Sequence, residues 1–285
     1  MKSLQQLANE GILFKDAESE LIKQNLFAVI KDASISNAFG RQLVDVINMT
    51  QGSTLDFILA DKNSTIVRQV SEGGEIPIDV EAYTKIQITP SKFGTRLAIT
   101  KEMIEDSNWP LLERNLREVG RQMSIKETNL VFTSFNDSTN GFPSNAAHDI
   151  TSASTELGVS DITNAMSPVE AADYAPDVMA LHPTQVNELR QLDTFVTADK
   201  VGDRRVFEMG WVGRIFGLDT MISSLQTADT VHVFDKKEAG VLVIRRPMTV
   251  ERWKEPLRDL ENAAITQRMA ARVLRATAGA RITVS

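Results

Sequence analysis

Residues 70–94 read VSEGGEIPIDVEAYTKIQITPSKFG, and the pattern on both sides of this stretch decides the fold. Gly73 and Gly74 form a turn signal between two glutamates. On either side of the turn, large apolar residues recur at every second position, as in strands whose two faces differ. The sequence therefore predicts a long β-hairpin over residues 53–98. The recurring apolar residues are Leu55, Phe57, Leu59, Ile86, Ile88, Phe93, Leu97 and Ile99.

The length of this hairpin bears on how it is covered. Arms of about fifteen residues would reach about 50 Å, whereas a compact domain of this chain's length has a radius of gyration of only about 19 Å. Because an isolated two-stranded ribbon is marginally stable and its edges favour pairing, we expect the hairpin to lie on another copy of the chain. An alternative stays open, in which sharp bends at Gly52 and Pro90 fold the hairpin back into an ordinary sheet.

The composition excludes several kinds of protein. The 285 residues include no cysteine, which excludes disulfides, thiolate metal sites and a cysteine nucleophile. The chain begins without the apolar run of a signal peptide, and no segment has the length and apolarity of a membrane span. The net charge of −7 argues against a protein that wraps nucleic acid.

Charge is distributed unevenly along the chain. Residues 245–285 hold nine Lys or Arg against four Asp or Glu, while the rest of the chain is strongly acidic. Such asymmetry can mark a basic edge of one copy that meets an acidic edge of the next, and it also fits two solvated faces of one globule. Both interpretations stay open at this point.

The remaining segments predict a mixture of helices and strands. A proline near its start and an apolar stripe predict a long helix over residues 110–135. The Ala and Arg content of residues 262–275 favours a helix by propensity, while the residues that follow suggest a strand. Further helices are predicted over residues 160–173 and 182–192, and strands at 177–181, 230–235, 239–244 and 247–253. Helical spacing near the N-terminus includes Phe39, Leu43, Val46 and Ile47.

No residues converge on a catalytic, cofactor or metal site. The three histidines, at 148, 182 and 232, are far apart in the sequence, and none has metal-ligand spacing to another. The glycines of residues 210–217 are not followed by Lys and Ser or Thr, so they form no phosphate-binding loop. Pairs of glutamates such as Glu72 and Glu75 are interpreted as solvated, or as acceptors for Arg across an interface. The sequence therefore predicts no enzyme, no cofactor and no metal.

The order of parts over residues 73–135 resembles the major capsid protein of tailed bacteriophages, with the Hong Kong 97-type fold. An acidic turn with EIP (75–77) is followed by YTKIQITPSKFGTRLAIT (83–100), then by KEMIEDS (101–107) and the long helix. The resemblance implies an α+β fold in which residues 262–275 are strand, against their propensity. It also implies the following division: an N-terminal arm (1–52), the extended-loop hairpin (53–98), a peripheral domain with its spine helix (99–137), an axial domain (138–245) and a return to the peripheral sheet that ends in the axial domain (246–285).

The resemblance implies a structural function. Copies would form hexamers and pentamers of an icosahedral shell around a double-stranded DNA genome, held without sequence specificity, with no membrane involved. Separate scaffolding, portal and decoration proteins would be further partners, the shell would assemble in the host cytoplasm, and the basic residues 245–285 would pair between subunits. Two alternatives stay open: an encapsulin-type compartment enclosing enzymes, and a soluble α/β enzyme or ligand-binding protein. The hairpin residues expected to contact a neighbour are Glu72, Gly73, Gly74, Glu75, Ile76 and Pro77.

Some relatives differ in how they assemble. Certain members join subunits by an isopeptide bond between a loop lysine and an asparagine, helped by a buried glutamate. The candidates here are Lys62 or Lys85 with Asn262, next to Glu261. Other members carry a cleaved N-terminal scaffolding extension, which we do not expect in the roughly fifty residues that precede this hairpin.

Overall fold

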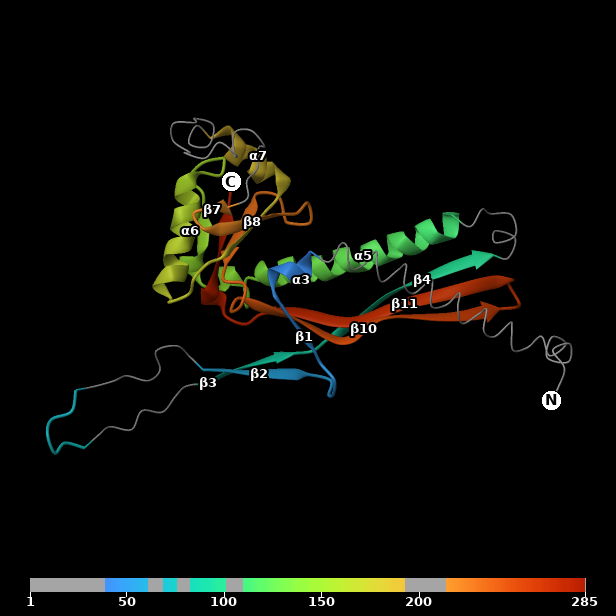
Figure 1. Ribbon diagram of the computed structural model, residues 1–285, viewed down its shortest axis with the longest axis horizontal. Helices are drawn as coiled ribbons and strands as arrows, with labels where there is room; N and C mark the ends of the chain where they lie inside the picture. The colour runs from blue at the N-terminus through green and yellow to red at the C-terminus, as the bar shows by residue number, and fades with distance from the viewer. Residues whose placement is uncertain (1–38, 61–68, 76–82, 101–109, 193–213, 285) are drawn as a thin grey trace, which may run out of the picture.

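The computed structural model describes residues 39–60, 69–75, 83–100, 110–192 and 214–284. These residues form three sheets and the helices that pack on them. Figure 1 shows a long sheet with one long helix along it, a second sheet with shorter helices at one end of that helix, and a hairpin on the opposite side of the long sheet. Among these described residues, no helix combines the length and apolarity needed to cross a membrane.

The long sheet has four strands in the order β1 (Asp45–Asn48), β10 (Gly240–Glu255), β11 (Leu260–Val273) and β4 (Ser91–Thr100). β1 runs parallel to β10, and the other pairs are antiparallel. The segment near residues 262–275, for which helix propensity and family resemblance disagreed, thus lies mainly in a strand, as the resemblance implied. Because β11 pairs with a strand on each side, its ladder hydrogen bonds override the helix propensity of its alanines.

Helix α5 (Pro110–Phe135) covers one face of this sheet, and its predicted bounds are confirmed. Its 26 residues give a length of about 39 Å. Met123 of α5 and Ile265 of β11 are buried against each other, with Val119 and Leu97 beside them. The predicted apolar stripe therefore faces the sheet.

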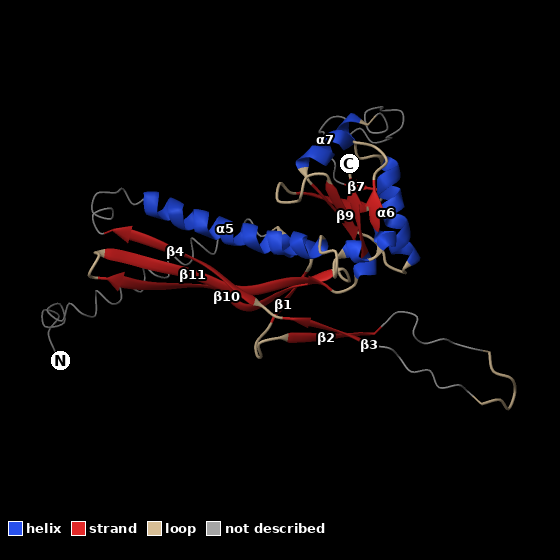
Figure 2. Cartoon of the chain, turned by 180° about the vertical axis from the view of Figure 1, so that it is seen from behind, coloured by secondary structure: helices blue, strands red, loops and turns tan. Residues whose placement is uncertain are grey.

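The second sheet has six strands, with helices α6 and α7 packed around it (Figure 2). The predicted helices and strands of this region are confirmed, and the last strand returns to this sheet as expected. His182 caps α7 by accepting a hydrogen bond from the backbone N–H of Thr184. The strands, in order, are β5 (Asp149–Thr151), β12 (Gly279–Thr283), β9 (Thr230–Phe234), β6 (Val178–Leu181), β8 (Leu218–Ile222) and β7 (Arg214–Ile215); the helices are α6 (Val159–Ala171) and α7 (Pro183–Gln191).

The helical prediction around residues 39–47 is wrong in its second half. Helix α3 is a single turn, Gly40–Leu43, and the chain is extended from Val44 onward. Val46 and Ile47 lie in β1, where they pair with Leu242 and Val243 of β10. This parallel pairing joins residues about two hundred positions apart, so local spacing could not indicate it.

The hairpin has a short paired root. β2 (Leu55–Ala60) and β3 (Tyr83–Ile88) are antiparallel, from the pair Leu55–Ile88 to the pair Ala60–Tyr83. The strand-like pattern that continues to Ile99 belongs to a second strand, β4, which pairs with β11 rather than with β2. Bends therefore exist near Gly52, whose φ is +82°, and Pro90, and they lay the described root of the hairpin on the sheet.

A charge on the inner side of α5 should unfold the subunit. Met123→Asp would bury an unpaired carboxylate against Ile265, and we expect it to cost about 3 kcal/mol or more of the free energy of unfolding. Gln122→Asp, which places the same charge on the exposed side, should cost less than about 1 kcal/mol. Urea denaturation followed by circular dichroism measures both, and equal losses would contradict the packing described.

Candidate functional site

The root of the hairpin presents two different faces. Its inner face carries Leu55, Phe57 and Ile88, which pack against Val241 and Val243 of β10. Its outer face carries Ile58, which is 70% exposed, and Tyr83, which is 61% exposed. Lys85 and Asp56 form an ion pair of 2.7 Å on this outer face. The described residues therefore leave an apolar side chain exposed on a ribbon that they cover on one side only.

Three arginines hold this root through backbone carbonyls. Arg245 of β10 donates hydrogen bonds to the carbonyls of Met49, Thr50 and Gly52, at 3.3, 2.8 and 3.0 Å. Arg268 of β11 donates to the carbonyl of Pro90 at 3.2 Å, and Arg275 donates to that of Ala60 at 3.1 Å. Hydrogen bonds from a charged donor are stronger than neutral ones, so the root is fixed at both of its ends.

These contacts give the basic C-terminal segment a function within the chain. The guanidinium groups that the structure describes hydrogen-bond or form ion pairs inside one copy, and the expectation that this segment also pairs between subunits stays a prediction. Those arginines are Arg245, Arg246, Arg258, Arg268, Arg272, Arg275 and Arg281.

The predicted contact residues of the hairpin turn are exposed. Gly74 N–H donates to the carbonyl of Ser71 at 2.9 Å, and Gly73 has a φ of +77°, which a glycine adopts without strain. Glu72 and Glu75 both lie on the surface. The other predicted residues, Ile76, Pro77 and Lys62, lie outside the described residues.

The half of the long sheet beyond the hairpin root carries an arginine–tryptophan cluster on the same face. The guanidinium of Arg96 donates to Asn262 Oδ1 at 3.0 and 2.7 Å, lies 3.2 Å from Glu255 and sits 5.2 Å from the centre of the Trp253 ring. Trp253 is 41% exposed, and Ala98 beside Asn262 is also exposed. No described residue outside this sheet is recorded in contact with the cluster.

Of the candidate cross-link residues, Lys85 and Asn262 lie in different surroundings within one chain. Lys85 is paired with Asp56 on the hairpin, whereas Asn262 is buried on β11 with its carbonyl oxygen held by Arg96. The amide nitrogen of Asn262 has no hydrogen-bond partner. A bond between copies stays a prediction.

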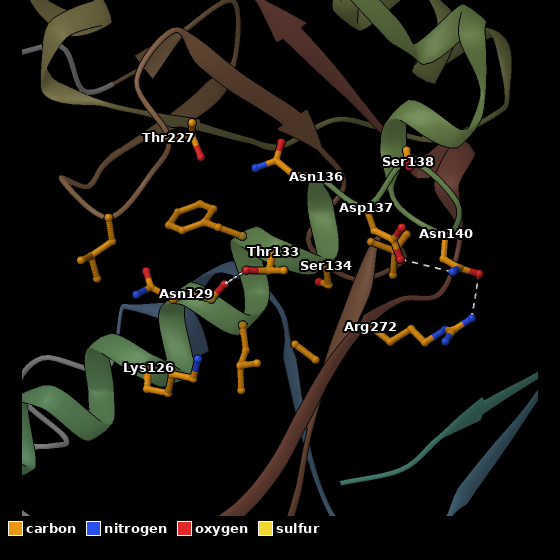
Figure 3. Close-up of a pocket in the computed structure, with 15 residues that line it drawn as sticks. Lys126, Asn129, Thr133, Ser134, Asn136, Asp137, Ser138, Asn140, Thr227 and Arg272 are labelled. Atoms are coloured by element: carbon orange, nitrogen blue, oxygen red, sulfur yellow. Dashed lines mark hydrogen bonds between the residues drawn. The ribbon is translucent and has the colours of Figure 1, made fainter. Parts of the chain in front are cut away.

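A polar hollow of about 920 Å³ lies between the C-terminal half of α5, β11 and the loop that holds Thr227 (Figure 3). Some of its polar groups hydrogen-bond to one another: Asp137 accepts hydrogen bonds from Thr139 N–H and the Asn140 side chain, and these bonds lower its pKa. Arg272 donates to Asn140 at 2.8 Å. No histidine lines the hollow, and the described residues hold no cluster of three potential metal ligands. The lining contains no arrangement of an activated nucleophile and a base.

The histidines have structural partners. His232 is fully buried; it accepts a hydrogen bond at Nδ1 from Gln226 Nε2 (2.8 Å), and its Nε2–H donates to Asn136 Oδ1 (3.1 Å). Burial, and then the charge of Arg281, lower the pKa of His232 to about 3. This neutral imidazole joins the end of α5 to the six-stranded sheet. His148 contacts the carbonyl of Gly279 at 3.0 Å, and burial lowers its pKa.

Sequence reasoning also missed a partly buried ion pair. Arg41 of α3 forms a bidentate ion pair with Glu127 of α5: Nε donates to Oε1 at 2.6 Å and Nη2 donates to Oε2 at 3.0 Å. Gly40 N–H donates to Thr128 Oγ1, and a Cβ at Gly40 would lie 3.0 Å from Thr128 Cα. These contacts hold α3 on the middle of the helix. No local pattern could have indicated them, since 86 positions separate Arg41 from Glu127.

The buried His232 predicts a loss of stability in acid. Its pKa is lower in the folded state than the ordinary value of 6.5, so the unfolded state binds more protons between these values and stability falls as the pH drops from about 6.5 toward 3. We expect His232→Gln to reduce this dependence of Tm on pH, although it lowers Tm at pH 7. Thermal melts of both proteins from pH 7 to 4 measure the difference, and parallel profiles would contradict the assignment.

Comparison with known proteins gives one family. A family model described as "Phage capsid protein" matches residues 83–282. A search of curated proteins finds no match.

Solved structures share the fold at low sequence identity. A chain of "Microbacterium phage Oxtober96" has a TM-score of 0.67 at 17% identity, covering 86% of this chain and 90% of that one. The "Capsid of native GTA particle computed with C5 symmetry" gives 0.69 at 13% identity, over 87% and 90%. The "Capsid structure of the Cyanophage P-SCSP1u" gives 0.67 at 14% identity, over 85% and 86%. At these identities the likeness extends to the fold alone.

Proposed function

The chain belongs to the phage capsid protein family, since the family model matches more than half of it, and we propose that its copies form the hexamers and pentamers of an icosahedral shell around double-stranded DNA. Membership makes the chain a major capsid protein of the virion, with a structural rather than an enzymatic role. The proposal adds the Hong Kong 97-type division into arm, extended loop, peripheral domain and axial domain.

The observation that carries this proposal is the half-covered hairpin. A two-stranded ribbon has little stability of its own, and this one exposes Ile58 on the face that no described residue of the chain covers. Burying such a side chain is worth about 1.5–3 kcal/mol. A closed shell repeats this contact in every subunit, so a small gain per copy favours the assembled state.

The surface that receives a neighbour's hairpin is proposed to be the open half of the long sheet. Its Arg96–Trp253 cluster lies on the same sheet face that the chain's own hairpin root covers at the other end. The hairpin turn carries Glu72 and Glu75, which are opposite in charge to Arg96. Charge complementarity of this kind guides the register of an interface.

The proposed contents and partners follow from charge and family. An acidic protein lets packed DNA lie against its wall without gripping it, because phosphates are repelled. Scaffolding, portal and decoration proteins are proposed partners, and host cytoplasm is the proposed place of assembly. The similar structures described as phage or GTA capsids favour this reading over an encapsulin-type compartment.

Ile58 gives a direct test of assembly. Ile58→Glu places a carboxylate opposite Lys85 in the hairpin, a favourable cross-strand pair, so the subunit should keep its Tm. We expect closed particles to fall at least tenfold, because the charge must be buried at the interface, while Ile58→Val should assemble normally. Sedimentation and negative-stain microscopy measure the yield. Undiminished particles from Ile58→Glu would contradict the proposal.

Charge reversal tests the receiving surface. Glu72→Lys with Glu75→Lys changes only exposed side chains, and we expect it to slow assembly severalfold by repelling Arg96 of the neighbouring copy. Adding Arg96→Glu should restore part of the rate at low salt. Light scattering during assembly measures these rates. Additive losses, without any rescue, would argue that the turn docks elsewhere.

A further inference from the structure

We propose that Arg275 is a positioning residue that sets the angle at which the hairpin leaves the subunit, and thereby the curvature of the shell. The claim about shell curvature rests on the proposed function. The claim that Arg275 tethers the hairpin concerns the single subunit.

Arg275 lies where the chain passes between the two main sheets. β11 ends at Val273, and the 3₁₀ turn Ala276–Ala278 leads into β12 of the six-stranded sheet. The backbone N–H groups of Leu274 and Arg275 donate to the carbonyl of Ala239, at 2.9 and 3.4 Å. Ala239 itself comes just before β10, so the crossings from β9 to β10 and from β11 to β12 meet at this point.

The guanidinium of Arg275 contacts three separate parts of the fold. Nη2 donates to the carbonyl of Ala60 at 3.1 Å, and Nη1 donates to Tyr174 Oη at 3.4 Å. Nε lies 3.2 Å from the carboxylate of Glu238, an ion pair without good hydrogen-bond geometry. Only 19% of the Arg275 side chain is exposed. A planar group with several fixed donors suits such a three-way contact, which an ammonium could not reproduce.

Each partner belongs to a different element. Ala60 ends β2 and forms the last described pair of the hairpin ladder with Tyr83. Tyr174 follows α6 of the six-stranded domain and is buried in its core. Glu238 lies in the turn between β9 and β10. The hairpin is thus tied at its point of departure to the six-stranded domain.

The other two arginines at the root have no such connection in the contacts that the structure records. Arg245 and Arg268 fix the opposite end of the root to β10 and β11 of the long sheet. One end of the hairpin root is hydrogen-bonded to the long sheet and the other end to a residue that contacts the six-stranded domain. The direction of the hairpin therefore depends on both parts. Arg275 is therefore the link through which a change in the relative tilt of these two domains would reach the hairpin.

A small change of angle at Ala60 becomes a large displacement at the turn. The thirteen positions from Ala60 to Gly73 allow a reach of up to about 45 Å. A rotation of about 10° over that reach moves the turn by about 8 Å. Such a shift exceeds the tolerance of a packed interface, so copies with a loosened tether should meet at varying angles.

The test uses the full-length chain before and after assembly. Arg275→Ala should raise amide hydrogen exchange in β2 and β3 by about tenfold or more in the unassembled subunit, and Tyr174→Phe, which removes the hydroxyl that accepts from Nη1, should act in the same direction but more weakly. Arg275→Lys should recover part of the protection through Glu238. Arg258→Ala removes an exposed arginine at the far turn of the long sheet and serves as the control, with exchange in the root unchanged.

Assembled particles test the effect of Arg275 on shell curvature. Cryo-microscopy of Arg275→Ala should give a diameter distribution broader than that of the wild-type chain, or open sheets, whereas Arg121→Ala, which removes an exposed arginine of α5, should give the wild-type diameter. Unchanged exchange in β2 and β3 would overturn the tether, and unchanged diameters would overturn its effect on curvature. If the wild-type chain formed no shells at all, the proposed function and the curvature claim would fail together, while the exchange measurement would still decide the tether.

Discussion

A two-stranded ribbon needs a second surface, and this requirement shapes the whole molecule. The hairpin root buries one face on the long sheet through Phe57 and Ile88, while Ile58 on the other face stays exposed. Backbone groups and apolar side chains on such a ribbon are stable only when something packs on them. In a protein whose family builds shells, we propose that a sister copy supplies the missing surface.

The long sheet packs against α5 on one face and against the hairpin root on the other. Along β11, one set of alternate residues, including Ile265 and Gln267, faces α5, and the other set, including Ala270, faces the hairpin. The period of two in a strand allows one element to meet a helix and a ribbon at once. The described residues cover this face at one end and leave Trp253 and Arg96 exposed at the other.

Local patterns in the sequence predicted much of the fold. The stripe of α5, the alternation of β2 and β3 and the helix α7 depend on neighbours in the chain, and all were found. The strand β11 followed from the family resemblance, against its helix propensity. Val46 and Ile47 were assigned to a helix because their strand partners in β10 lie far away in sequence.

The site was harder to predict. The exposed turn at Glu72–Glu75 was expected, but the excess of positive charge near the C-terminus was interpreted without its partners. Arg245, Arg268 and Arg275 donate to carbonyls between 178 and 215 positions away. Every residue has a backbone carbonyl, so the sequence does not indicate which one an arginine will contact. The Arg96–Trp253 cluster joins strands that are far apart in the sequence. Neither could therefore be recognised before the fold was known.

A cryo-microscopy map of the assembled particle tests the central claim most directly. The account predicts that the outer face of each hairpin root, at Ile58, is buried against a neighbouring copy and that the turn at Glu72 and Glu75 lies near that copy's Arg96. A map in which Ile58 stays open to solvent, or in which the ribbon touches its own subunit alone, would contradict it.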